Sequence, residues 1–182
     1  MKIIIAITAA SGSIYSRLLL EELIENDSVE KIGVILSEHA KEVMQYEGES
    51  IPSNDKISVY ENNNLFASMA SGSSIWDAMV ILPCSTGTMG RIASGVSSTL
   101  IERSADVMLK ERRTLILCLR ETPLSLIHIK NAEKITLAGG IILPAAPSFY
   151  SHPTSIESLC RSVTQRIRRL LGLKANTFEW DD

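Results

Sequence analysis

The residues best placed to do chemistry follow a short apolar run in the middle of the chain. The run Thr114–Leu119 has the length and composition of a buried strand. Arg120 and Glu121 come directly after it, so a cation and a carboxylate stand at its carboxyl end. Open α/β sheets bind their ligands at this end of their strands. The pair is consistent with a ligand site and equally with an ion pair on the surface.

Three other apolar runs are followed by small or hydroxyl-bearing residues. Small side chains let a ligand approach the backbone, and the first N–H groups of a following helix can bind phosphate. Ordinary strand-to-helix turns have the same composition, and Ser37 is also placed to cap the helix after it. The residues concerned are Ala9, Ala10 and Ser11, then Ser37, and then Ser85, Thr86, Gly87 and Thr88.

The helical period places one acidic residue, Glu47, in line with an apolar stripe. Ala40, Val43, Met44 and Glu47 recur at the spacing of a single helix face. A carboxylate that faces the interior needs a partner or a raised pKa. Glu47 also fits a position beyond the last buried turn, where water would solvate it.

A second charged residue, Arg166, recurs with Leu159 and Val163 along one face of the final helix. This spacing predicts an inward guanidinium, which in proteins usually meets an anion or a carboxylate. Arg168 and Arg169 fall off that face and are expected to complement the helix dipole.

Lys110 is a further cation for which the sequence allows two roles. Asp106 and Lys110 are one helical turn apart, a spacing typical of a solvated ion pair. Alternatively, Lys110 joins Arg120, Arg166 and Tyr150 in a second anion site. Two anion sites beside one sheet suggest a phosphorylated cofactor and a phosphorylated substrate.

Strand and helix alternate along most of the chain, which predicts a three-layer α/β fold with a mostly parallel sheet and helices on both faces. Pro83 is expected to close one strand, and Thr154 with Glu157 to form a capping box at the final helix. Strands are expected at 2–8, 31–36, near 57–60, 77–82, 114–119 and 141–143. Helices are expected at 14–25, 38–47, 124–138 and 155–171, with two more between residues 85 and 110.

Length and composition indicate a single domain over residues 1–182. A formal net charge of −3 gives no general basic surface for nucleic acid. The three cysteines lack a pairing or metal-binding spacing, which favours a reducing cytoplasm and no structural metal. No apolar run approaches a membrane span, and no G-x-G-x-x-G, Walker or Ser-His-Asp pattern is present.

Four segments carry a more specific pattern. They are T-A-A-S-G-S-I-Y near the start, P-C-S-T-G-T, P-A-A-P-S-F-Y, and the long run A-D-V-M-L-K-E-R-R-T-L-I-L-C-L-R-E-T-P-L-S-L-I-H. In these segments the chain resembles the UbiX-type flavin prenyltransferases. The resemblance covers nearly the whole chain, and the long run is too extended to arise by chance.

The resemblance implies a flavodoxin-like fold and a dodecamer with flavin sites at subunit interfaces. Members of the family join a dimethylallyl unit from dimethylallyl monophosphate to N5 and C6 of reduced FMN, without a metal. The product, prenylated FMN, serves UbiD-type decarboxylases. Cations suited to a departing phosphate agree with this chemistry, and Glu47 or the phosphate itself is a candidate base for the proton lost at C6.

The resemblance also assigns roles by position. The expected FMN contacts are Ala9, Ala10, Ser11, Ser37, Ser85, Thr86, Gly87, Thr88 and Arg120, and the expected donor contacts are Lys110, Arg120, Glu121, Tyr150 and Arg166. The expected catalytic set is Ser11, Glu47, Lys110 and Glu121, of which Ser11 and Glu47 are linked to proton handling. Two departures stand out: Ala9 replaces the usual Gly, and Phe66 or Trp180 is expected to serve where some relatives place a Trp.

Two other functions fit parts of the sequence. Flavin-dependent cysteine decarboxylases resemble the first turn but carry P-A-S-A-N-T and a catalytic His. Here the segment reads P-C-S-T-G-T, and no His lies between His39 and His128. A carrier that only stores or delivers FMN would not need an inward Arg166 or Glu47.

Overall fold

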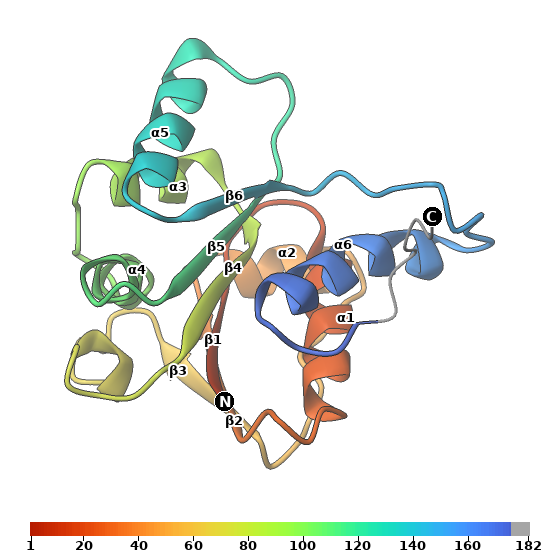
Figure 1. Ribbon diagram of the computed structural model, residues 1–182, viewed down its shortest axis with the longest axis horizontal. Helices are drawn as coiled ribbons and strands as arrows, with labels where there is room; N and C mark the ends of the chain where they lie inside the picture. Colours follow the sequence, from red (N-terminus) through yellow and green to blue (C-terminus); the bar gives the residue numbers. More distant parts are fainter. Residues whose placement is uncertain (176–182) are drawn as a thin grey trace.

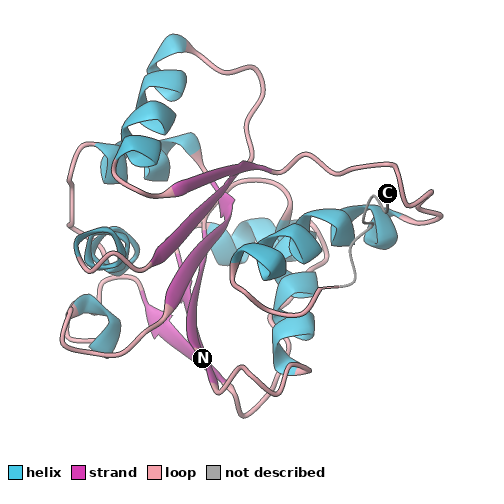
Figure 2. Ribbon diagram, viewed as in Figure 1, coloured by secondary structure: helices cyan, strands magenta, loops and turns pink. Residues whose placement is uncertain are grey.

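The computed structural model describes residues 1–175 and is built on one six-stranded sheet (Figures 1 and 2). Every pair of neighbouring strands in it is parallel. The strands are β1 Lys2–Ile7, β2 Lys31–Leu36, β3 Ile57–Glu61, β4 Ala78–Cys84, β5 Thr114–Leu119 and β6 Ile141–Pro144.

The strand order β3-β2-β1-β4-β5-β6 is that of a doubly wound sheet. The chain starts in the middle at β1, winds outward to β3, and returns to β4 on the other side of β1. Without the edge strand β3, the order is that of flavodoxin-like folds, as the resemblance implied. Ligands of such sheets bind where the winding reverses, which here is between β1 and β4.

Helices cover both faces of the sheet (Figure 1). One face is covered by α1 Ser13–Ile24, α2 Ala40–Tyr46 and α6 Ile156–Leu170, and the other by the short helix η1 Ser68–Ala70 with α3 Thr86–Ala93, α4 Leu100–Lys110 and α5 Leu126–Leu137. None of the helices within residues 1–175 is long and apolar enough to cross a membrane.

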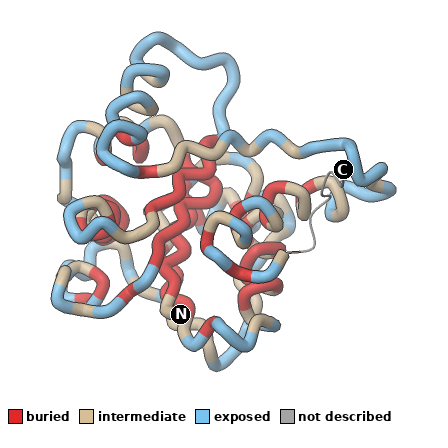
Figure 3. The backbone as a smooth tube through the Cα atoms, viewed as in Figure 1, coloured by how far each residue is buried: buried red, intermediate tan, exposed pale blue. Residues whose placement is uncertain are grey.

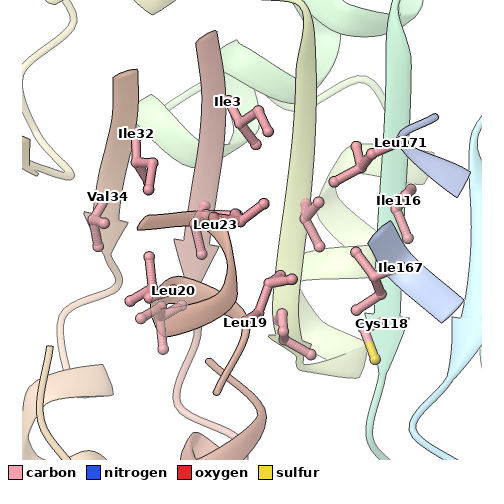
Figure 4. Packing of buried hydrophobic residues seen from close by; sticks show 14 of the residues in the cluster. Ile3, Leu19, Leu20, Leu23, Ile32, Val34, Ile116, Cys118, Ile167 and Leu171 are labelled. Atoms are coloured by element: carbon pink, nitrogen blue, oxygen red, sulfur yellow. The ribbon is translucent and has the colours of Figure 1, made fainter. Parts of the chain in front are cut away.

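Alternate residues of the strands feed two separate cores. Ile3 and Ile5 pack toward α1 and α6, whereas Ile4 and Ala6 pack toward α3 and α4. The central strands are therefore buried on both sides (Figure 3), which explains their nearly continuous apolar sequences. Figure 4 shows the first core, in which leucines of α1 lie against β1 and β2, while Ile167 of α6 lies beside Ile116 and Cys118 of β5.

Most of the predicted elements are confirmed, and four local expectations are wrong. Pro83 does not close β4, because the strand continues to Cys84 across an irregularity in its pairing with β5 that accommodates a residue without an N–H. Helix α5 begins later than expected, after the cap residue Ser125. Ser37 caps no helix, and α6 is capped by Ser155 and Ser158 instead of Thr154 and Glu157.

Thr8 joins the two strands at the winding reversal. Its side chain is almost fully buried. The hydroxyl donates to the Pro83 carbonyl at 2.8 Å and accepts from the Ser85 N–H at 2.9 Å. One hydroxyl thus satisfies two backbone groups and holds the turn after β4 against the end of β1.

We expect Thr8→Val to lower the free energy of unfolding by about 1–3 kcal/mol, because the shape is kept while the Ser85 N–H loses its acceptor and the Pro83 carbonyl keeps only the Thr8 N–H as a donor. Urea unfolding followed by circular dichroism measures this change. The matched control is Thr136→Val, whose hydroxyl is exposed on α5 and donates to Ala132. Equal stability losses in the two variants would contradict the bridging role of Thr8.

Candidate functional site

Backbone hydrogen bonds bring the predicted ligand turns together at the carboxyl edge of the sheet. Ser37 N donates to Ile7 O at 2.9 Å, and Thr8 N donates to Pro83 O at 3.3 Å. Arg120 N then donates to Cys84 O at 3.1 Å. The bonds pass from strand to strand in spatial order. The segments gathered along this edge are 9–11, 37, 85–88 and 120–121, as the sequence predicted.

The start of α3 is the part of this edge best suited to a phosphate. Ser85 is the cap residue and accepts from the Thr88 N–H, while the N–H groups of Thr86 and Gly87 belong to the first helical turn and have no partner within the helix. Gly87 is exposed, and a Cβ there would meet only the tip of Arg91. The donors and the open backbone fit the phosphate of a flavin mononucleotide.

Thr88 differs from its neighbours in this turn. Its side chain is buried, and its hydroxyl accepts from the Ser85 hydroxyl at 3.1 Å and from Arg91 at 3.4 Å. Within residues 1–175 these contacts make Thr88 a support for Ser85, so a direct contact with a ligand remains a prediction.

Glu47 has partners that periodicity did not identify. Its carboxylate accepts from the Gly12 N–H at 3.0 and 3.1 Å and from the Ser13 N–H at 2.7 Å. Burial raises the pKa of Glu47, but hydrogen bonds from the Ser11 side chain and from Ser13 and Gly12 outweigh it, so the pKa is lowered. The carboxylate of Glu47 therefore occupies the start of α1. The sequence suggested that these N–H groups could bind a phosphate, but in the structure Glu47 already binds them.

Arg120 and Glu121 lie at the edge but do not pair within the described chain. Arg120 is exposed, and its charge acts on the phenol of Tyr15. The Glu121 carboxylate instead accepts from the Thr122 N–H at 2.9 Å and from the Thr86 hydroxyl at 3.4 Å. The surface ion pair considered from the sequence is therefore absent from residues 1–175, and Arg120 is an exposed cation at this edge.

Tyr15 is a residue near Arg120 that was not singled out from the sequence. Burial, with smaller effects from Cys160 and Cys118, raises its pKa to about 12, while Arg120 acts in the opposite direction. Tyr15 is therefore a half-buried, neutral phenol whose pKa responds both to Arg120 and to Cys160 of α6. The T-A-A-S-G-S-I-Y segment already contained Tyr15, but its period alone gave no reason to choose it.

Tyr150 and Arg166 meet at a separate hollow of about 340 Å³ between α6 and the segment after β6. Arg166 is exposed there, so the prediction of an inward guanidinium is wrong. The buried face of α6 consists of Cys160, Val163, Thr164 and Ile167. Arg166 lines the hollow beside Tyr150, which agrees with the expected donor site while correcting the orientation.

Lys110 lies far from this group of residues. It ends α4 just before β5 begins, whereas Arg120 follows the end of β5. The six residues of β5 separate the two by about 20 Å at ~3.3 Å per residue. The expected pair with Asp106 is wrong, because Asp106 binds Arg103 at 2.8 Å and Lys110 binds Glu111 at 2.7 Å. The role of Lys110 in an anion site stays a prediction.

The remaining expectations have simpler outcomes. Ser37 lines a second, open hollow of about 830 Å³ beside the ends of β2 and β3. Phe66 is fully exposed, and Trp180 lies outside the described residues. Among residues 1–175, no group of three or more His, Cys, Asp or Glu side chains is arranged to hold a metal ion.

Comparisons with known proteins agree on one family. The model of the Flavoprotein family matches residues 1–168. The chain is 40% identical over 182 residues to the flavin prenyltransferase UbiX of Methanocaldococcus jannaschii, covering 98% of this chain and 97% of the relative.

Solved structures give the same result. The crystal structure of AnUbiX (PadA1) in complex with FMN and dimethylallyl pyrophosphate has a TM-score of 0.90 at 37% identity, covering 100% of this chain and 97% of that one. A dodecameric FMN-dependent UbiX-like decarboxylase from Escherichia coli O157:H7 has a TM-score of 0.91 at 31% identity, covering 100% of both chains. The cysteine decarboxylase TvaF shares only the fold, at 14% identity and a TM-score of 0.66.

We expect Glu47→Gln to lower the free energy of unfolding by about 1 kcal/mol at pH 7, because an amide complements the start of α1 less well than a carboxylate. Since the folded pKa lies below its ordinary value of about 4.3, the difference between the variants should be full above that value. It should disappear as the pH falls through the lowered folded pKa.

Chemical unfolding of both proteins between pH 7 and pH 3 measures this difference. Glu133→Gln on α5 is the control, since its exposed pair with Lys130 contributes little. A stability difference that stays constant over the whole pH range would mean that the charge of Glu47 does not hold the start of α1.

Proposed function

The chain belongs to the flavin prenyltransferases of the Flavoprotein family, and from this premise we propose that it joins a dimethylallyl unit to N5 and C6 of reduced FMN. The observation that best supports this function is that the ligand turns of a doubly wound sheet meet at one edge, beside a hollow lined by Tyr150 and Arg166. A cysteine decarboxylase or a simple FMN carrier accounts for the edge alone.

We assign the FMN phosphate to the start of α3. The Thr86 and Gly87 N–H groups and the Ser85 hydroxyl lie there, and Arg120 supplies a positive charge on the adjoining strand. Ala9 and Ala10 leave the backbone of the first turn accessible, and Ser37 extends the edge toward β2. Reduced FMN supplies the electron-rich nitrogen and carbon that the allylic group joins.

The donor phosphate is assigned to the hollow beside α6. Arg166 and the Tyr150 hydroxyl can bind a phosphate that gains negative charge as the allylic C–O bond breaks. Guanidinium groups perform the charge neutralisation that a metal ion would otherwise provide. The donor is a dimethylallyl phosphate, consistent with the ligand present in the AnUbiX complex.

Glu47 is better suited to organising the site than to accepting the final proton. Its lowered pKa and its three backbone contacts describe a carboxylate that is held in its charged form and is a weak base at neutral pH. The departing phosphate, with a second pKa near 6, is the stronger candidate base. Glu47 instead orients Ser11 and the turn that faces the flavin.

Lys110 is proposed to act in a neighbouring subunit. Within one chain it stands at the opposite end of β5 from Arg120, so its assigned role requires a second copy. Leu126, Ile127 and Leu137 of α5 are exposed apolar residues that an assembly would cover. We further propose that the chain forms a single domain over residues 1–182 and assembles into a dodecamer. The enzyme would act in the cytoplasm and deliver its product to a UbiD-type decarboxylase.

Anaerobic incubation with reduced FMN and dimethylallyl monophosphate should raise the mass of the flavin by one five-carbon unit, as measured by mass spectrometry. Arg166→Gln should reduce kcat/KM for the donor by about 100-fold, because a charge-assisted contact to the leaving phosphate is lost. Lys174→Gln, in the chain after α6, is the control. Absence of a mass gain with both the monophosphate and the pyrophosphate would end the prenyltransferase proposal.

Mixing two inactive variants tests the shared site. Lys110→Ala and Arg120→Ala should each be inactive alone, and unfolding and reassembling them together should restore part of the activity. Mixed assemblies then contain sites in which an intact Lys110 from one copy meets an intact Arg120 from another. Activity that stays at the level of the separate variants, despite confirmed subunit exchange, would place both residues in one chain's site.

A further inference from the structure

The hollow beside α6 is lined by more cationic side chains than the donor assignment uses. Arg161, Arg166 and Arg169 all line it, together with Tyr150 and several serines. Arg161 enters from the same helix as Arg166. The charge state of its surroundings therefore influences how strongly the hollow attracts a second phosphate group.

Arg161 is bound by carboxylates of α1. Its Nη1 lies 2.8 Å from Glu22 Oε1, and its Nη2 lies 3.5 Å from Glu21 Oε2. The Glu22 side chain is only 6% exposed, whereas that of Arg161 is 39% exposed. A buried carboxylate thus holds a half-exposed guanidinium at the wall of the hollow.

Glu22 is bound more extensively than a surface partner of Arg161 would be. The Thr164 hydroxyl donates to Glu22 Oε1 at 3.0 Å, and Arg168 Nη1 lies 3.8 Å from Oε2. Among residues 1–175, Glu22 Oε2 and Arg168 Nε are nevertheless buried atoms without a hydrogen-bond partner. Burying a carboxylate that is not fully satisfied is costly, so a role beyond packing is favoured.

We propose that Glu22 determines the donor selectivity of the hollow by neutralising Arg161. This inference rests on the proposed function, because it concerns the same donor site. With Arg161 held by Glu22, the hollow binds a phosphate monoester through Arg166 and Tyr150, and Arg161 is not available to bind a second phosphate. Glu22 is accordingly a positioning residue that makes the hollow select prenyl monophosphate over prenyl diphosphate.

Glu22→Gln tests the proposal because the amide keeps the size of the side chain and can still accept from Arg161 and Thr164. It removes the negative charge and frees Arg161 to attract a second phosphate. Inorganic phosphate and pyrophosphate are titrated calorimetrically into the FMN-loaded protein. We expect pyrophosphate to bind about fivefold more tightly in the variant, with phosphate changed by less than about twofold.

The donor preference should follow the same ratio. The ratio of kcat/KM for dimethylallyl pyrophosphate to that for the monophosphate should rise about fivefold in Glu22→Gln. A purely structural role of Glu22 would lower both values together. Glu133→Gln makes the same change of charge on the other face of the sheet and should leave the ratio unchanged.

A double variant separates the charge of Arg161 from other effects. In Glu22→Gln/Arg161→Gln the gain in pyrophosphate binding should disappear, since the freed cation is absent. The single variant Arg161→Gln gives a readout even if Glu22→Gln folds poorly. In an otherwise intact protein it should change pyrophosphate binding by less than about twofold, because Glu22 already engages Arg161.

Three results would overturn the inference. They are unchanged or weaker pyrophosphate binding in folded Glu22→Gln, a gain that persists in the double variant, and a large loss of pyrophosphate binding in Arg161→Gln. A different outcome would separate the two proposals. If the ratio of pyrophosphate to phosphate affinity shifts but the protein prenylates flavin with neither donor, the role of Glu22 is supported and the proposed function is refuted.

Discussion

The parallel sheet places the carboxyl ends of its strands at one edge, and the site depends on how that edge satisfies its backbone groups. Thr8 is central because its hydroxyl binds both Pro83 and the Ser85 N–H where the winding reverses. Ser37 and Arg120 are joined to the same edge through their own N–H groups. The turns that face a ligand are therefore extensions of the sheet, held by bonds between strands distant in sequence.

Two carboxylates then decide which positive groups remain available to anions. Glu47 binds the N–H groups at the start of α1, whereas the start of α3 keeps the N–H groups of Thr86 and Gly87 in its first turn. Glu22 similarly binds Arg161, whereas Arg166 stays exposed at the same hollow. Both cases follow one physical rule: a cation or helix end paired with an internal carboxylate attracts an outside anion less strongly.

A single chain does not bring all of the predicted site residues together. Lys110 and Arg120 occupy opposite ends of β5, so no motion of a side chain brings them to one ligand. Helix α5 exposes apolar residues to solvent, and exposed apolar patches often mark interaction surfaces. An assembly would cover this surface and bring charged residues of different copies together. The dodecameric relative from Escherichia coli shows that this fold supports such assemblies.

The sequence by itself determined the order of strands and helices, the turns at the strand ends and the family. These depend on apolar period, small residues and unbroken motifs, all of which are local. Only the tertiary structure decided that Arg166 is exposed, that Glu47 binds Gly12, and that Glu22 binds Arg161. The helical period of apolar residues predicts the helix face on which a residue lies. It does not predict the partner of that residue on another helix, as for Glu22 and Arg161, which are 139 positions apart. A further limit applies to Lys110, because its place in a site depends on how separate copies of the chain assemble.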